Sequence, residues 1–207
     1  MKSKKLIALT VVIAAFCLPM HALAYQMVKR DNKNPALTFD ADLVNSGTTE
    51  KVSLIRRSPD NEDDVLAMAA IKVEMDGKSF LKEVGIANRY ATSIGHLRIK
   101  SNQKNFIILS QPIGTDCWRI RLYSFDGNGI SEELSAYSDR PSIEVKDADV
   151  NDIEIVVLNR DTQSDPERDD YSISYRYWDN KWQVKNIYRT ATKEYVASDK
   201  WPNIVKR

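Results

Sequence analysis

Histidine and cysteine, the side chains that most often carry catalysis or bind zinc, are scarce in this sequence. It contains His21, His96, Cys17 and Cys117, and the first member of each pair lies in the N-terminal segment 1–24. A Cys117–His96 dyad would need a proximity that the spacing does not predict, and the residues around Cys117 match no motif of a cysteine enzyme. A lone cysteine within a strand is more often a small buried apolar side chain, and we interpret Cys117 in that way.

Motifs of the common enzyme classes are absent too. The chain has no His-Glu-x-x-His zinc motif, no Gly-x-Ser-x-Gly elbow and no glycine-rich phosphate loop. We therefore expect no enzyme activity and no catalytic or cofactor-binding residues. The alternative is a hydrolase with an unrecognised pair of carboxylates, since the chain has 29 aspartates and glutamates whose spacing in sequence does not define their separation in space.

Two acidic runs and several aromatic residues are candidates for recognition. The runs at 58–64 and 161–170 lie between expected strands, and such polar loops are either solvated or a place where binding residues concentrate. The aromatic residues indicate either core packing or a platform for sugar or protein; we assign Trp118 and Trp178 to the core and leave Trp182 and Trp201 open. The candidate partner-binding residues are Asp60, Glu62, Asp63, Asp64 and Trp182.

The elements that must position these residues are β-strands. Apolar and polar residues alternate with period two in several segments, as in the strands of a half-buried antiparallel sheet. In segment 118–123, for example, Arg119, Arg121 and Tyr123 fall on the face opposite to the apolar residues. The expected exception is a short helix at 64–71 (DVLAMAAI).

Three tight turns recur along the chain at a similar interval. The pairs at 76–77 (DG), 126–127 (DG) and 179–180 (DN) each follow a large apolar residue, and such pairs tolerate positive φ and favour primed hairpin turns. An apolar strand precedes each turn, with a period near 50 residues that is typical of propeller blades and similar β-arrays. The pattern predicts an all-β fold of antiparallel hairpin repeats, propeller-like or a sandwich. The repeats are expected at about 37–97, 98–141 and 142–190, followed by a tail at 191–207.

The segments before the first and third apolar strands add a resemblance to a known family. Residues 40–50 (DADLVNSGTTE) and 147–154 (DADVNDIE) resemble the FG-GAP/VCBS-type repeat, in which a D-x-[DN]-G-D-G-x-x-[DE] loop precedes a hydrophobic strand. The resemblance covers most of the chain beyond residue 24 and implies calcium-loop β-hairpins, often found as propeller blades. The middle repeat departs from the pattern, with SNQKN at 101–105 in place of the acidic loop.

The resemblance implies calcium ligands in the two acidic loops. In the first loop Val44 and Ser46 stand where side-chain oxygens are expected, and the second loop is shorter than the family pattern. Calcium takes about six to eight oxygen ligands, so backbone oxygens and water would have to complete either site. The alternative is that the acidic and amide side chains cap turns. The candidate ligands are Asp40, Asp42, Asn45 and Glu50 in the first loop and Asp147, Asp149 and Asn151 in the second.

The N-terminus predicts export. A lysine-rich start precedes an apolar run at 6–18, which is shorter than the ~20 residues of a membrane span, and Ala22-Leu23-Ala24 offers a signal-peptidase site. Cleavage of the signal peptide 1–24 leaves one domain, 25–207, and changes the formal charge from +1 to −2. This charge predicts no nucleic-acid partner, and no later apolar run predicts membrane insertion. An uncleaved anchor is the alternative.

Together these features predict a soluble exported binding protein, located in the periplasm or released from the cell. We expect a protein partner, as for small periplasmic inhibitors and immunity proteins, because the chain is short, lacks catalytic motifs and has acidic loops that could cover another protein's cleft. A carbohydrate or cell-wall binding module built on the aromatic faces is the first alternative, and the hydrolase is the second.

Overall fold

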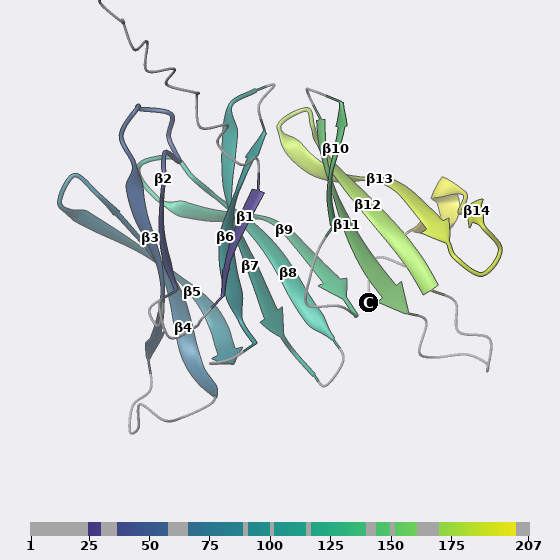
Figure 1. Cartoon of the computed structure of the whole chain (residues 1–207), viewed down its shortest axis with the longest axis horizontal. Coiled ribbons are helices and arrows are strands. Elements are labelled where there is room, and N and C mark those ends of the chain that lie inside the picture. Colours follow the sequence, from purple (N-terminus) through teal and green to yellow (C-terminus); the bar gives the residue numbers. More distant parts are fainter. Residues whose placement is uncertain are drawn as a thin grey trace, which may run out of the picture.

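The computed structural model describes residues 25–29, 37–57, 66–88, 91–99, 102–114, 117–139, 144–149, 152–160 and 170–201. Over these ranges the fold is all-β, as the alternating sequence predicted, with one short 3-10 helix at Ser198–Lys200. Three antiparallel sheets, each built on a meander of four strands, lie side by side along the molecule (Figure 1).

The chain completes one sheet before it begins the next. The first sheet contains β2 (Thr38–Ala41), β3 (Glu50–Arg57), β4 (Leu66–Met75) and β5 (Lys78–Asn88). The middle sheet contains β6 (Ser93–Ile99), β7 (Lys104–Pro112), β8 (Trp118–Phe125) and β9 (Ile130–Ser138), with β1 (Tyr25–Lys29) added beside β6. The third contains β10 (Glu144–Asp149), β11 (Asp152–Arg160), β12 (Asp170–Trp178) and β13 (Lys181–Arg189), with β14 (Glu194–Tyr195) added beside β13.

Each meander closes with a turn at the position that its sequence predicted, and two of the three turns are of the predicted primed type. The β4–β5 turn holds Asp76 and Gly77 at φ of 49° and 75°, and the β12–β13 turn holds Asp179 and Asn180 at 52° and 58°. Two successive residues in the left-handed region give a primed turn, whose twist matches that of the strands. The β8–β9 turn is longer, and there Asp126 accepts two backbone hydrogen bonds of 2.8 Å, which lower the pKa of its carboxyl.

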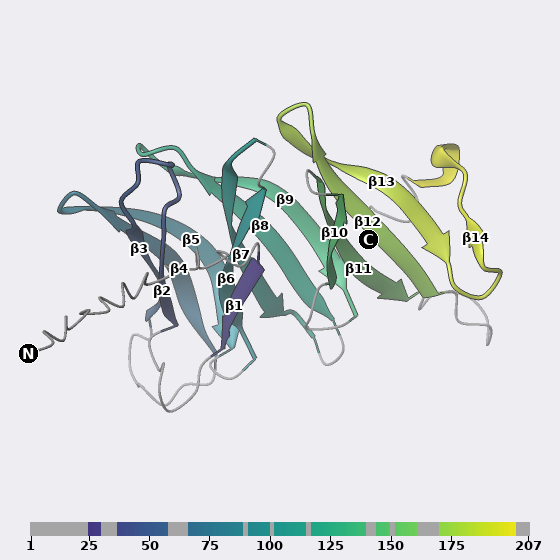
Figure 2. The ribbon, with the colours of Figure 1, turned by 45° about the horizontal axis from the view of Figure 1, so that its top comes forward.

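The middle sheet is covered by the first sheet on one face and by the third sheet on the other. Figure 2 shows the order of the three sheets from a second direction. Alternate residues of β7 divide between the two cores. Ile107 and Leu109 pack against the first sheet, whereas Phe106 and Ile108 pack against the third, and none is more than 1% exposed. Burial on both sides accounts for the unbroken apolar run in this strand, and it stabilises the fold by about 1.5–3 kcal/mol for each large side chain.

This double burial contradicts the half-buried sheet expected for β8. The face predicted to meet solvent carries Arg121 at 9% and Tyr123 at 0% exposure. Alternation separates two faces of a strand, but a stacked sheet also buries its polar face where the polar groups find hydrogen bonds. Burial raises the pKa of the Tyr123 hydroxyl.

The short helix expected at 64–71 is wrong over its described residues. Leu66–Met75 forms β4, which pairs with β3 on one side and β5 on the other. Alanine and methionine favour a helix locally, but Ala69 and Ile71 pack into the core between the sheets, at 3% and 0% exposure. Packing and pairing on both edges outweigh the local propensity.

Candidate functional site

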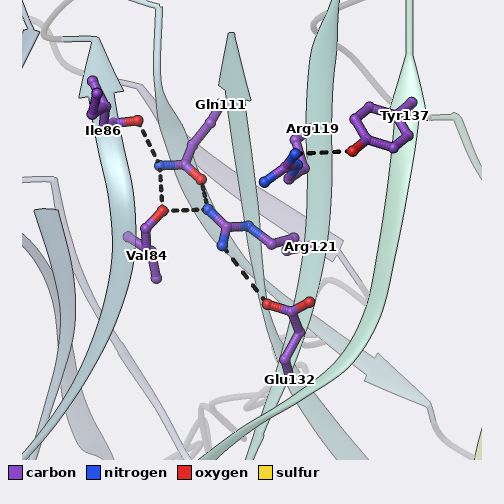
Figure 3. Close-up of polar contacts among 7 residues, drawn as sticks. All are labelled: Val84, Ile86, Gln111, Arg119, Arg121, Glu132 and Tyr137. Carbon is purple, nitrogen blue, oxygen red and sulfur yellow. Dashed lines mark hydrogen bonds and ion pairs between the residues drawn. The ribbon is translucent and has the colours of Figure 1, made fainter. Parts of the chain in front are cut away.

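A buried polar network joins the edge strand of the first sheet to the middle sheet (Figure 3). Arg121 of β8 donates to Gln111 of β7, which is 1% exposed, and both side chains donate to the backbone carbonyl of Val84 on β5. Gln111 also donates to the carbonyl of Ile86 at 3.1 Å. Side chains of the middle sheet therefore satisfy carbonyls of β5, the edge strand of the first sheet within the described residues.

The network meets β5 at a bulge. The β4–β5 register shifts between Ala69 and Ala70, leaving Val84 as the extra residue. Gly85 follows it with φ of 76°, a conformation that glycine adopts at little cost. Bulges often re-aim the backbone next to functional sites, and this one lies where β5 receives the hydrogen bonds of Gln111 and Arg121.

Arg119 lies on the same face of β8, two residues before Arg121. Its Nη2 donates to the hydroxyl of Tyr137 at 2.9 Å, and its guanidinium lies 5.2 Å from the centre of that ring. Its Nε is buried without a hydrogen-bond partner, and within the described residues no carboxylate pairs with its charge. Arg121, by contrast, has Glu132 at 3.7 Å. Among the described residues, Arg119 therefore has a hydrogen-bond partner in Tyr137 and no carboxylate to balance its charge.

An open cleft of about 500 Å³ lies beside the network. Its polar lining consists of Asn88, Gln111 and the two arginines. Its apolar lining includes Leu66, Ile86 and Ile113, which are 61%, 60% and 48% exposed. Large apolar side chains left exposed around a cleft indicate a binding surface, and this volume suits a small ligand or one or two side chains of a peptide.

A second hollow, of about 270 Å³, lies at the opposite end of β7. Its lining includes Asn45, Asn105, Asp126 and Tyr177 from all three sheets and their loops. Asn105 donates to Asn45 at 2.9 Å, and Asp126 accepts from its own turn. Because its polar groups largely satisfy one another, we take the first cleft as the candidate site.

The first predicted calcium loop connects β2 to β3. The carboxylate of Asp42 accepts from two backbone N–H groups of its own loop, at 2.9 and 3.0 Å, and Glu50, 1% exposed, accepts from a third at 2.6 Å. Asn45 donates to a backbone carbonyl of the β6–β7 turn at 2.6 Å, and Asp40 is exposed on β2. Asp42, Asn45 and Glu50 thus bond backbone groups, as the turn-capping alternative expected.

The second predicted calcium loop is described only in part. Asp147 and Asp149 lie on β10, opposite Ile153 and Asp152 of β11, and Asn151 lies outside the described residues. Over the described ranges, no three side chains among His, Cys, Asp and Glu form a group that could hold a metal ion. Calcium binding by either loop stays a prediction.

A pair of amides connects the first loop to His96 of the middle sheet. Asn45 accepts from Asn105, whose Oδ1 lies 3.1 Å from His96 Nε2. Burial lowers the pKa of the imidazole, against the opposing effects of Asn105 and Asp42. His96 therefore favours the neutral form, and its ring centre lies 6.4 Å from that of Phe39.

Two tryptophans exchange the roles expected for them. Trp182, a candidate partner-binding residue, is 8% exposed and meets Phe106 and Tyr177 edge to face, with ring centres 5.5 and 5.6 Å away. Trp178, assigned to the core, is 61% exposed and lies 4.7 Å from the Arg176 guanidinium. The cause is register: Trp182 pairs with Tyr177 on the face toward the middle sheet, so Trp178 falls on the other face. Trp182 is therefore mostly buried in the core between the middle and third sheets.

The remaining partner-binding candidates, Asp60, Glu62, Asp63 and Asp64, lie outside the described residues and stay a prediction. Cys117 lies just before β8 and is partly buried. Burial raises the pKa of its thiol, with a further contribution from Asp139, and so disfavours the reactive thiolate.

Sequence reasoning missed the role of Gln111, Arg119 and Arg121. Alternation placed both arginines on one face of β8, but that face was assigned to solvent. The threefold repeat in the sequence could have predicted this role, because the middle sheet in a stack of three is covered on both faces. Arginines on either face of 118–123 must then be buried in a network or line a cleft.

Comparisons with protein-family models, curated proteins and solved structures found no match. Nowhere in the described part of the chain is there a helix with the length and apolar character of a membrane span.

Proposed function

We propose that this chain is an exported, non-catalytic binding protein that recognises a protein partner, in an inhibitor or immunity-type role. The observation that carries the proposal is the cleft beside β5, where the guanidinium of Arg119, which has no carboxylate partner among the described residues, lies among exposed apolar side chains. Arginine is one of the residue types enriched among the energetic hot spots of protein interfaces, and exposed large apolar side chains around a cleft mark an interaction surface.

The chemistry of the cleft selects one kind of occupant. Arg119 provides donors for a carboxylate, which guanidinium groups bind with directional, charge-assisted hydrogen bonds. Leu66, Ile86 and Ile113 provide apolar surface beside it. The complementary ligand is a segment of a partner protein with an Asp or Glu next to a bulky apolar residue.

The acidic run at 58–64 precedes one of the residues that line the cleft. Residues 58–65 connect β3 to β4 and end at Leu66, which lines the cleft. The contacts of Asp60, Glu62, Asp63 and Asp64 with a partner are part of this proposal. A mixed acidic and basic surface of this kind favours specificity and makes binding weaken as salt is added.

Export follows from residues 1–24, as proposed from the sequence. N-terminal sequencing of the protein recovered from the cell envelope or culture fluid is expected to begin at Tyr25. Recovery of the intact N-terminus from membranes would instead favour the uncleaved anchor.

A peptide-display selection tests the recognition site. Selection on the wild-type protein is expected to enrich peptides that carry Asp or Glu beside Leu, Ile or Phe, and the Arg119→Leu variant is expected to lose this enrichment. Arg98→Leu is the matched control, because Arg98 lies on β6 at the opposite end of the middle sheet. Equal enrichment on the wild type and Arg119→Leu would contradict the proposal. Retention of purified cell-wall glycan without peptide enrichment would favour the carbohydrate-binding alternative.

A further inference from the structure

The smaller hollow, of about 270 Å³, is lined by residues of all three sheets and their loops. The β2–β3 loop contributes Asn45, β7 contributes Asn105 and β12 contributes Tyr177. Mutual contacts hold these walls in place: Asn105 donates to Asn45 at 2.9 Å, and the ring of Tyr177 packs edge to face on Phe106, with ring centres 5.1 Å apart. A pocket whose walls are held in this way is formed before a ligand arrives, which lowers the cost of binding.

Three charged side chains line this hollow without pairing with one another. They are Lys104, Asp126 and Glu133, and within the part of the chain that the structure describes none of them forms an ion pair. Each carboxylate accepts its hydrogen bonds through one oxygen: Asp126 Oδ1 accepts from two backbone N–H groups at 2.8 Å, and Glu133 Oε1 accepts from the Ser124 hydroxyl at 2.6 Å. An ammonium group and two further carboxylate oxygens thus line one space with bonding capacity left.

A β-bulge places Glu133 in the wall of the hollow. The β8–β9 register shifts so that Glu133 is the extra residue of β9. The last strand of each of the other two meanders has a bulge as well, with Val84 in the first sheet and Lys185 in the third as the extra residue. Among these three bulges, the one in the middle sheet therefore carries the carboxylate. Bulges re-aim side chains next to functional sites, and here the re-aimed side chain lines a pocket.

We propose that this hollow binds a free α-amino acid, a small ligand that carries both charges. Its ammonium group complements Asp126 and Glu133, and its carboxylate complements Lys104. Tyr177 adds a neutral donor, because burial and the nearby Glu133 raise the pKa of its hydroxyl. A neutral sugar would shield the three charges from water without giving them a counter-charge. The volume lies just below the range of about 300–1,000 Å³ that is usual for larger ligands, so a single amino acid fits better than a peptide.

Titration with free amino acids tests this inference, which does not depend on the proposed function. The protein is expressed from the whole coding sequence with a C-terminal tag, and each standard L-amino acid is added singly in calorimetry and in thermal unfolding. At least one is expected to bind and to raise the unfolding midpoint. The methyl ester and the N-acetyl derivative of that amino acid each lack one charge, and both are expected to bind about ten-fold more weakly or worse. No binding of any amino acid, or equal affinity for either derivative, would overturn the proposal.

Charge-removing variants locate the binding site. Glu133→Gln and Lys104→Met are each expected to weaken binding of the same amino acid by about ten-fold or more. Glu194→Gln and Lys200→Met are the matched controls, because both residues are exposed and lie outside the lining of the hollow, and they are expected to bind as the wild type does. Unfolding midpoints measured without ligand show that all four variants remain folded. Unchanged affinity in Glu133→Gln and Lys104→Met, or the same loss in the controls, would place the binding elsewhere and overturn the proposal.

Discussion

Replacing Arg121 with methionine separates the structural arginine of β8 from the one proposed to bind a ligand. The side chain is 9% exposed and donates to Gln111 and to the carbonyl of Val84. Arg121→Met leaves the Gln111 Oε1 acceptor unpaired inside the protein, while Val84 keeps its bond from Gln111. An orphaned buried acceptor costs about 1–3 kcal/mol, and a lost charge-assisted hydrogen bond costs a similar amount.

The variant no longer buries the guanidinium charge of Arg121 on folding, and this offsets part of the loss. We therefore expect Arg121→Met to lower the free energy of unfolding by about 2–4 kcal/mol. For a chain of this length the midpoint of thermal unfolding then falls by about 4–16 °C. Arg119→Met is the matched control, since it loses its hydrogen bond and ring contact with Tyr137 but orphans no buried acceptor, and it is expected to cost less than about 1 kcal/mol. Urea unfolding followed by tryptophan fluorescence gives both values at one protein concentration. Equal costs for the two variants, or no cost for Arg121→Met, would refute the reasoning.

Three further predictions concern the core, a titrating group and a turn. Trp182→Ala is expected to destabilise the protein by about 3–5 kcal/mol in urea unfolding, whereas Trp182→Phe costs about 1 kcal/mol because the indole N–H has no partner to lose. The pKa of His96 is lower in the folded protein than in the unfolded chain. As pH falls, the unfolded chain therefore takes up this proton at a higher pH than the folded protein, so the free energy of unfolding declines below about pH 6.5. His96→Gln is expected to flatten this decline when unfolding is measured from pH 7 to pH 5, and an unchanged slope would contradict the assignment. Gly77→Ala, at φ of 75°, is expected to cost about 1–2 kcal/mol. Gly129→Ala, free of positive φ and of contacts within 4 Å, serves as its control and should leave the unfolding midpoint in place.

The parts of the fold that local chemistry determines were predictable. The Asp76-Gly77 and Asp179-Asn180 turns lie where the sequence placed them, because their backbone needs residues that tolerate positive φ and few other pairs do. The apolar strands, such as β7, were visible as continuous runs because they are buried on both faces. The all-β class and the repetition of strands followed from these two signals.

The parts that depend on neighbours in space were not predictable. Segment 64–71 has the composition of a helix, but β3 and β5 pair with both edges of β4. Trp178 and Trp182 flank one turn, and only the register of β12 with β13 decides which of them is buried. The cleft required Arg119 and Arg121 to be placed against β5, whose bulge lies more than thirty positions earlier in the sequence. Alternation within one strand carries no information about that partner.

Photocrosslinking in the producing cells tests the proposed recognition site most directly. A photoreactive amino acid replaces Ile113, which is exposed in the cleft, or Thr48, which is exposed on the distant β2–β3 loop. The predicted result is one protein crosslinked from position 113 and not from position 48, with the product lost when Arg119→Leu is added and the fold retained. The same crosslinks from both positions, or a product at 113 that does not depend on Arg119, would contradict recognition of a partner through this cleft.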